Sequence, residues 1–519
     1  MKTMSAVLVM ATLVFLVPLH IYAQQSTVAA DSQSEQRAQV QRFSFIGNTA
    51  FTPEVLSEIV KEFQGKELTL AELHSVAEKV ADYYHQRGYF LAKVILPEQS
   101  IDNGNVTLQI FEGKLGKITI SGNKSYPDGF LQKYFANMKQ EGIIQQDSLE
   151  SALLLVNDLP GLKAKSVLRA GAQNGDTDII INVEENPRSQ GSIEASSFGS
   201  RNWRSISFMN RGQRGGSFST RVVDGNMPNN LSFVNASYSL PIDAKGTCAS
   251  LYILKGDFGV GQEFASLNIT GKASAIGAAF TRPLIKTRAQ SIAAELGFDM
   301  RNSEQDMLGL TSSRDRIRVL RLGLHRNTED MDGRTFMSLF LQQGLGSMFG
   351  GMDNNDPLSS RPVAGADGRF TKLNFDSARI QGLRPKSFLI SRLSGQISSK
   401  SLVVGEQMAI GGIDSVRGYY SSEYLGDSGV QANLEARFAS SATQPEKFQT
   451  ALFVDWALAS IRKPALGQTK SASLIGAGFG IRANIYENIS IRADLGFALG
   501  RQPSDAGKAI SYLQVSRKI

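Results

Sequence analysis

The chain has 519 residues, four histidines, one cysteine and a formal net charge of +7 at pH 7. This length is sufficient for several domains, and the basic residues are scattered rather than gathered into runs, so we expect no nucleic-acid partner. Cys248 has no second cysteine with which to form a disulfide bond, and no Cys/His cluster exists, so we expect neither a metal site nor a cofactor.

Residues 1–23 have the pattern of an export signal. Lys2 supplies a positive charge, an apolar run extends from Ala6 to Val17, and the segment ends in the small residue Ala23. The apolar run is too short for a membrane-spanning helix, which needs about 20 residues. We therefore predict cleavage after Ala23, and we interpret residues 24–39 as a short linker.

Two stretches about 75 residues apart repeat one another. Residues 43–48 (Phe-Ser-Phe-Ile-Gly-Asn) and residues 118–123 (Ile-Thr-Ile-Ser-Gly-Asn) each predict an alternating strand and a turn, and a proline-containing helix start follows both. Repetition at a fixed offset indicates one module used twice. We place the first module at residues 40–113 and the second at residues 114–186.

Each module is predicted to contain a strand, two helices and two further strands, in that order. In the first module, Thr52 is a candidate cap before Pro53, and Thr69 with Glu72 fits a capping box. The two later strands of this module are predicted near residues 91–97 and 106–111. In the second module, helices are predicted near residues 128–138 and 147–157, and strands near residues 165–170 and 178–184.

From residue 187 to residue 519 the chain is rich in Gly and Ser, and alternating apolar residues replace helical periods. The strand from Leu474, for example, has Phe479 and Ile481 on one face and Arg482 on the other. Such alternation over about ten residues is typical of a membrane barrel, although a soluble β-sandwich would alternate similarly. A strand edge exposed to hydrocarbon would leave backbone groups unsatisfied, so the sheet should close. The region would hold about 16 strands around an aqueous channel.

The most specific motifs lie in the last fifth of the chain. Glu406-Gln407 precedes Ile410-Gly411-Gly412, and residues 415–419 read Ser-Val-Arg-Gly-Tyr. Farther on, Phe453-Val454-Asp455 lies in a strand whose alternate positions form an apolar outer face. Strand parity therefore directs Phe453 and Asp455 into the lumen.

These motifs, together with the strand ends at residues 238–241 (Tyr-Ser-Leu-Pro) and 281–284 (Thr-Arg-Pro-Leu), resemble the TpsB transporters of two-partner secretion. This is the ShlB/FhaC/HecB type within the BamA-like superfamily, and the two modules look like POTRA domains. The resemblance implies two α+β POTRA domains followed by an all-β transmembrane barrel. It also implies the outer membrane of a Gram-negative bacterium, with the POTRA domains in the periplasm.

The resemblance further implies that a loop around residues 405–425 folds back into the lumen. There Arg417 would pair with Asp455, since a guanidinium can be fixed by a bidentate contact with a carboxylate. Ala457 stands where the family usually has Gly. The loop-motif residues are Gly411, Gly412, Val416, Arg417, Gly418 and Tyr419, and the barrel-wall partners are Phe453 and Asp455.

The implied mechanism is passive export without ATP. The modules would capture an unfolded exoprotein, such as an adhesin or a haemolysin, by β-augmentation. Leu91, Val94 and Leu96 are the candidate substrate-binding residues, although core packing would explain most such side chains. Outer-membrane lipid, and the barrel assembly machinery during biogenesis, are the other partners expected.

Three other classes of protein are weighed as alternatives. Gly426-Asp427-Ser428-Gly429 is similar to the nucleophile turn of trypsin-like proteases, but that chemistry needs a histidine, and the barrel's His325 has no supporting motif. We therefore expect no enzyme. An outer-membrane insertase of the same superfamily is the closer alternative, yet such proteins usually carry more than two POTRA modules. A diffusion porin would leave the two modules unexplained.

Overall fold

The computed structural model describes residues 37–519 apart from residues 199–200, 213, 227–230, 260–267, 385, 487, 501–506 and 508. The predicted export signal and residues 24–36 of the predicted linker lie outside the described residues. The chain divides into two compact units. One comprises the described residues up to Tyr83 together with Val94–Ile110, and the other comprises Tyr84–Lys93 and the chain from Phe111 onward.

The first module contains more strands than predicted. Strand β1 (Arg37–Val40) pairs antiparallel with β3 (Lys66–Thr69), so the last residues of the predicted linker are a strand instead. Each of these four-residue strands acquires its partner from a distant part of the chain, which local periodicity does not reveal. The other elements are β2 (Arg42–Ile46), α1 (Pro53–Ile59), η1 (Lys61–Phe63), α2 (Leu70–Gln86), β4 (Lys93–Ile95), η2 (Asp102–Gly104) and β5 (Asn105–Phe111).

Local capping fixes the start of α2. The Thr69 hydroxyl accepts a hydrogen bond from the Glu72 N–H at 3.2 Å, and the Glu72 carboxylate accepts one from the Thr69 N–H at 2.7 Å. The predicted capping box is therefore confirmed. Thr52 occupies the cap position of α1, but its side chain makes no capping hydrogen bond. Strand β2 pairs parallel with β5, and β4 lies at the end of the order β2-β5-β4.

The second module repeats the strand–helix–helix–strand–strand order, with one correction. The helix predicted near residues 128–138 is broken into α3 (Asp128–Gln132), η3 (Lys133–Phe135) and α4 (Ala136–Glu141). Its other elements are β6 (Lys114–Ser121), α5 (Gln146–Asn157), β7 (Leu162–Ala170) and β8 (Asp176–Glu185), with the strand order β6-β8-β7. Residues such as Leu131, Phe135 and Ile179 form its buried core.

A carboxylate at the end of β8 closes the turn that precedes α3. Glu185 accepts hydrogen bonds from the backbone N–H groups of Lys124, Ser125 and Tyr126 at 2.9–3.2 Å. Burial alone would raise the pKa of Glu185, but these donors stabilise the carboxylate and hold the pKa below its usual value.

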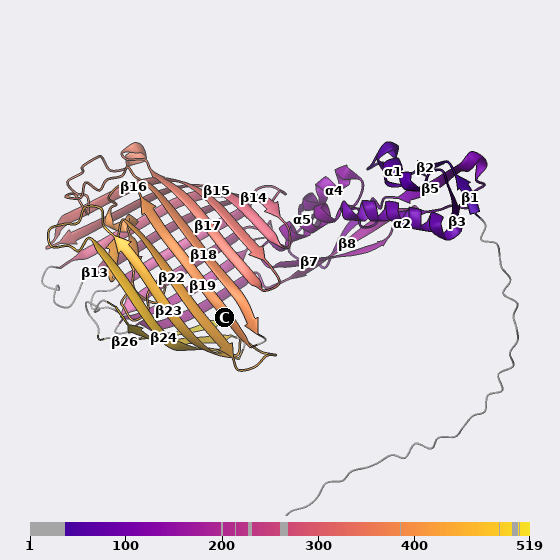
Figure 1. Cartoon of the computed structure of the whole chain (residues 1–519). Helices are drawn as coiled ribbons and strands as arrows, with labels where there is room; N and C mark the ends of the chain where they lie inside the picture. The colour runs from indigo at the N-terminus through magenta and orange to yellow at the C-terminus, as the bar shows by residue number, and fades with distance from the viewer. Residues whose placement is uncertain are drawn as a thin grey trace, which may run out of the picture. The chain divides into compact units, whose positions relative to one another are not determined.

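Among the described residues, sixteen antiparallel strands form the closed barrel that the sequence predicted (Figure 1). Each strand pairs with its neighbours, and β26 pairs with β9 from Tyr512↔Phe198 to Lys518↔Ser192. The strands are β9 (Ser189–Phe198), β10 (Arg201–Arg211), β11 (Ser217–Asn226), β12 (Leu231–Pro241), β13 (Cys248–Gly259), β14 (Thr270–Lys286), β15 (Gln290–Met307), β16 (Leu310–Glu329), β17 (Gly333–Gly344), β18 (Thr371–Arg384), β19 (Ser387–Ser398), β22 (Ser428–Ala439), β23 (Phe448–Ser460), β24 (Ser471–Ile485), β25 (Ile489–Ala498) and β26 (Ala509–Lys518).

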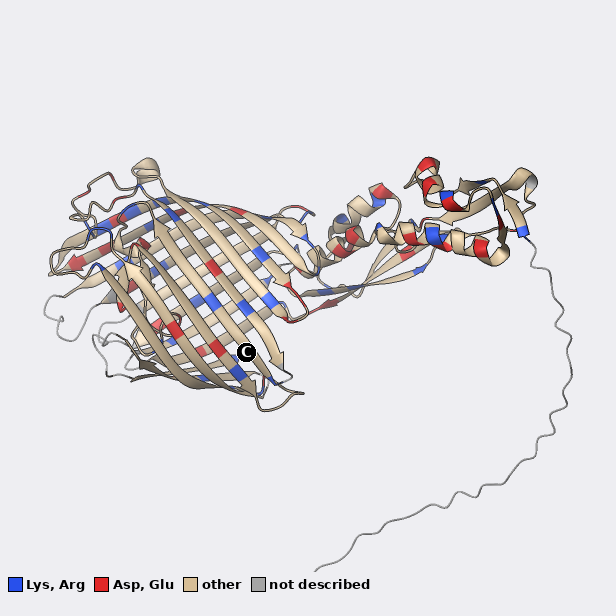
Figure 2. Ribbon diagram, in the orientation of Figure 1, with Lys and Arg blue, Asp and Glu red and all other residues tan. Residues whose placement is uncertain are grey.

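The two faces of the barrel wall differ in polarity. On β23, the outward residues Leu452 and Val454 are more than half exposed, whereas the inward residues Phe453 and Asp455 are buried. Acidic and basic residues occur near one another along the barrel strands (Figure 2). No helix among the described residues has both the length and the apolar composition needed to cross a bilayer.

Long connections gather at the end of the barrel away from the start of β9. Residues 345–370 join β17 to β18 and include η5 (Met348–Gly350), and residues 461–470 join β23 to β24. Residues 399–427 join β19 to β22 and contain η6 (Val404–Glu406) and a short hairpin, in which β20 (Met408–Ile410) pairs with β21 (Tyr424–Gly426). We call residues 399–427 the lumen loop.

Candidate functional site in the barrel lumen

The lumen loop lies inside the barrel. Its Arg417 contacts Asp455, which faces away from the outward residues Leu452 and Val454 of the same strand. Since alternate residues of a strand point to opposite faces, the loop must occupy the inner side of the wall.

Arg417 is buried and makes a two-point contact with one carboxylate. Its Nε and Nη2 donate to the two oxygens of Asp455 at 2.7 and 2.9 Å, and its backbone N–H donates to Asp455 at 3.1 Å. Its Nη1 donates to Glu435 on β22 at 2.6 Å. The guanidinium carbon also lies 3.3 Å from the centre of the Phe453 ring. The side chain is therefore held in one orientation by charge and by stacking.

The Arg417 site belongs to a larger charged cluster that we had not assigned from the sequence. Glu435 also pairs with Arg437 and Arg482, and Asp494 pairs with Arg482 and Arg492. We call these residues, with Arg417 and Asp455, the tip cluster. All the wall members occupy inward positions on β22–β25, so strand parity was the signal that could have grouped them.

The remaining loop-motif residues shape the turn that carries Arg417. Gly411, Gly412 and Gly418 have φ values of 100°, 97° and 101°. A Cβ on Gly418 would lie 2.6 Å from the backbone nitrogen of Ala498, so only glycine fits there. The Gly418 N–H donates to the Tyr512 hydroxyl, which in turn donates to the Tyr419 carbonyl at 2.7 Å.

A small apolar cluster supports the same turn. Ala457, the position where the resembled family usually has Gly, is fully buried, and its methyl group is part of this packing. The cluster consists of Ile410, Val416 and Tyr419 from the loop and Ala457, Ala459 and Leu474 from the wall.

A second charged cluster holds the loop near its start. Here the loop contributes a carboxylate and the wall contributes the cations, the reverse of the Arg417 site. Glu406, which is 3% exposed, lies 2.8 Å from Arg301 on β15 and 2.7 Å from Lys372 on β18. Arg301 also pairs with Asp299, which pairs with Arg321, and Arg321 pairs with Glu295. We call these six residues the stem cluster. Sequence reasoning named Glu406 only as part of a motif.

Asp427 has a structural role. Its two carboxylate oxygens accept hydrogen bonds from the Leu402 N–H at 2.9 Å and the Arg462 N–H at 2.8 Å, and Arg361 forms an ion pair with it. Ser428 accepts from the Ser398 N–H, and His325 lies 3.1 Å from Glu295. Among the described hydrogen bonds, no serine–histidine pair of the protease type joins Ser428 to His325.

The residues predicted for substrate binding lie around the short edge strand β4. Val94 is in this strand, and Leu96 follows it directly; both are partly buried. Leu91 instead packs against the buried core of the second module. In the part of the chain that the structure describes, no three His, Cys, Asp or Glu side chains are grouped to hold a metal ion.

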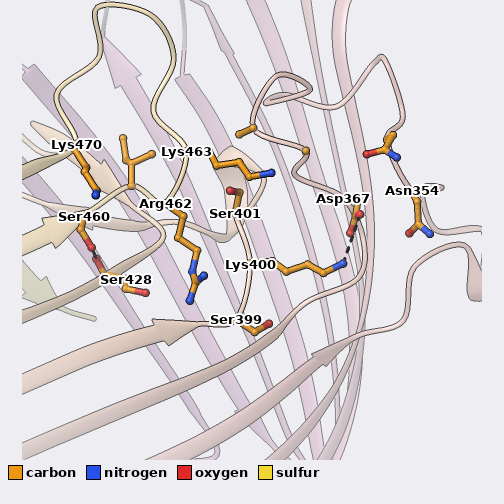
Figure 3. A pocket seen from close by; sticks show the side chains of 14 residues that line it. Asn354, Asp367, Ser399, Lys400, Ser401, Ser428, Ser460, Arg462, Lys463 and Lys470 are labelled. Carbon is orange, nitrogen blue, oxygen red and sulfur yellow. Dashed lines mark hydrogen bonds and ion pairs between the residues drawn. The ribbon is translucent and has the colours of Figure 1, made fainter.

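A pocket of about 830 Å³ opens among the long connections (Figure 3). Lys400, Arg462, Lys463 and Lys470 line it, and Lys400 lies 4.0 Å from Asp367. Its lining residues come from all three long connections and from the neighbouring strand ends, so these connections leave a cavity between them.

Comparison with known proteins identifies the family. The family model for haemolysin secretion/activation proteins ShlB/FhaC/HecB matches residues 217–483, and the model for the ShlB-type POTRA domain matches residues 38–113. The chain belongs to the ShlB/FhaC/HecB family. The transporter is therefore an outer-membrane β-barrel with periplasmic POTRA domains, from a family that transports exoproteins in two-partner secretion. The resemblance inferred from the sequence is confirmed.

Individual relatives support this assignment. The transporter is 24% identical to the heme/hemopexin transporter protein HuxB of Haemophilus influenzae over 485 residues, which cover 90% of this chain and 84% of HuxB. Among solved structures, CdiB from Escherichia coli has a TM-score of 0.78 at 16% identity, covering 96% of this chain and 93% of CdiB. BamA from Haemophilus ducreyi, lacking POTRA domains 1–3, has a TM-score of 0.53 at 15% identity, covering 93% of this chain and all of that one.

Proposed function

We propose that the transporter exports one large exoprotein through its barrel lumen, and that Arg417 holds the lumen loop in a closed resting state. The observation that carries this proposal is the buried two-point contact between Arg417 of the loop and Asp455 of the wall. A polypeptide passing through the lumen must displace a loop that lies there. The strength of this contact would therefore set how readily the channel opens.

Export would need no ATP. The POTRA domains capture the unfolded exoprotein in the periplasm, and its folding outside the cell prevents return. We place capture at the edge strand β4, where an extended substrate segment would add by β-augmentation beside Val94 and Leu96; the position of β4 at the end of the order β2-β5-β4 supports this. A large adhesin or haemolysin is the class of cargo proposed, with outer-membrane lipid around the barrel and the barrel assembly machinery acting during biogenesis.

The test compares medium and cell-surface proteins, by mass spectrometry, between the wild-type strain and a strain lacking this gene. Loss of one large exoprotein, with other barrel proteins unchanged, is the expected result. Complementation with Arg417→Ala is expected to alter export, whereas Arg334→Ala, at an exposed ion pair with Glu329, is expected to restore it fully. A broad loss of barrel proteins would instead identify an insertase.

A further inference from the structure

The lumen loop consists of two parts with different attachments. Residues 402–410 and 424–427, which we call the stem, include the β20–β21 hairpin and both Glu406 and Asp427. Residues 411–423, which we call the tip, carry Arg417. The backbone changes character at the boundary, since Gly411, Gly412 and Ser422 all have positive φ values.

The stem is attached to the wall through carboxylates. Glu406 reaches Arg301 and Lys372, and its backbone carbonyl accepts further hydrogen bonds from Lys372 at 3.2 Å and from Gln396 at 3.1 Å. At the other end of the stem, Asp427 joins the loop to Arg361 and to the Arg462 N–H. The stem is therefore tied to three wall strands (β15, β18 and β19) and to both other long connections.

The tip is attached through one guanidinium, to a different part of the wall. Arg417 pairs with residues on β22 and β23, and the nearby Gly418 and Tyr419 bond to Tyr512 on β26. The charged contacts of the stem and those of the tip share no residue, so each set can be broken without breaking the other.

Charge balance distinguishes the two attachments. Without Arg417, the wall part of the tip cluster has three carboxylates (Glu435, Asp455, Asp494) and three arginines (Arg437, Arg482, Arg492). Without Glu406, the wall part of the stem cluster has two carboxylates (Glu295, Asp299) and three cations (Arg301, Arg321, Lys372). Buried charges need partners. The wall part of the tip cluster therefore has no net charge when the tip leaves, whereas the wall part of the stem cluster keeps one net positive charge when the stem leaves.

We infer that the stem stays fixed during transport and that opening is confined to the tip, with Glu406 as the residue that positions the stem. The tip pivots at Gly411–Gly412 and near Ser422, where the backbone already has the conformations of a turn. This inference rests on the proposed function, since it assumes that the exoprotein passes through the lumen.

The inference can be tested with two matched cysteine pairs in a Cys248→Ser background. Met408→Cys with Ala459→Cys joins the stem to β23, and Val416→Cys with Ala457→Cys joins the tip to the same strand. Ala457 and Ala459 are neighbouring inward positions, so the wall partners are equivalent. A short, cleavable bifunctional thiol reagent bridges each pair. Export is expected to stop when the tip is bridged, to continue when the stem is bridged, and to return when the tip bridge is cleaved.

The other outcomes separate the inference from the proposed function. If bridging the stem stops export as fully as bridging the tip, the inference is wrong and the lumen route stands. If neither bridge affects export, the lumen route itself is wrong. The single-cysteine variants, treated with the same reagent, control for modification without bridging, and heat-modifiable migration on gels shows that each barrel has folded.

The role of Glu406 in positioning the stem can also be tested by a second measurement, which does not depend on bridging. In planar bilayers, Glu406→Gln is expected to give larger and longer openings than Arg417→Ala, because the whole loop rather than the tip is freed. Glu406→Asp is expected to restore small openings. A purely structural role would lower the amount of folded barrel and leave the conductance of each channel unchanged, and that result would overturn the inference.

Discussion

At the scale of single residues, the charge balance of the lumen predicts what loss of Arg417 does. The arginines of the tip cluster compensate Glu435 and Asp494, and Asp455 keeps a hydrogen bond from Asn433 at 2.9 Å. Asp455 is fully buried and Arg417 is the cation that pairs with it, so removing Arg417 breaks a buried ion pair, a change that usually costs about 3–5 kcal/mol.

We predict that Arg417→Ala opens the channel without unfolding the barrel. The loss of stability is expected to be about 3 kcal/mol, at the lower end of that range, because Asp455 keeps the hydrogen bond from Asn433. The expected result is more frequent channel openings in planar bilayers, with an unchanged amount of heat-modifiable barrel. Arg417→Lys should be intermediate, since lysine cannot reproduce the two-point contact. Failure of Arg417→Ala to accumulate in the membrane would show that Arg417 is required for folding instead.

Gly418 allows a prediction with a close control. Gly418→Ala places a Cβ 2.6 Å from the Ala498 nitrogen at a φ of 101°. The tip can then no longer pack against β25, so channel openings should increase as in Arg417→Ala. Gly467 also has a positive φ, 79°, but a Cβ there meets nothing within 4 Å. Gly467→Ala should therefore cost only about 1–2 kcal/mol of local strain and leave conductance unchanged. Equal conductance of the two variants would contradict this account.

At the scale of elements, some local signals were read correctly from the sequence, whereas the pairing of β1 with β3 and the break between α3 and α4 were not predicted. The capping box of Thr69 and Glu72 and the alternation along β23 depend on neighbouring residues, so both could be predicted. Strands β1 and β3 could not, because each exists only through pairing with the other. The same reason explains why the stem cluster was missed: Glu406 and Arg301 are 105 positions apart.

The turn held by Glu185 predicts a pH dependence for the second POTRA domain. The pKa of Glu185 is lowered in the folded state, so its contribution to stability is present above the unfolded pKa, about 4.3, and is lost as the pH falls through the folded value. Glu185→Gln should cost about 1 kcal/mol at pH 7, and the difference from wild type should shrink towards pH 3. Hydrogen exchange of the amides of residues 124–126 measures this. The exposed neighbour Glu184 provides the control Glu184→Gln, and a constant difference across this pH range would contradict the assignment.

At the scale of the whole molecule, the proposed function assigns capture and passage of the exoprotein to different parts of the chain. The alternation and length of residues 187–519 sufficed to predict a closed barrel of about this size. They did not show which connections fold inward, because that depends on contacts between the lumen loop and strands distant in sequence. Capture is assigned to the POTRA domains and passage to the lumen, so a variant of one function should leave the other intact.

Strand β4 provides the test of this separation. Val94→Pro removes a backbone donor and blocks pairing along an edge strand, so it should abolish most export if the exoprotein adds there. Channel conductance and the amount of folded barrel should not change, because Val94 is not part of the lumen site. The matched variant Val167→Pro alters β7, the corresponding edge strand of the second module, and should retain export. Loss of export in Val167→Pro but not in Val94→Pro would assign capture to the second POTRA domain, and loss in neither would exclude β-augmentation at both edges.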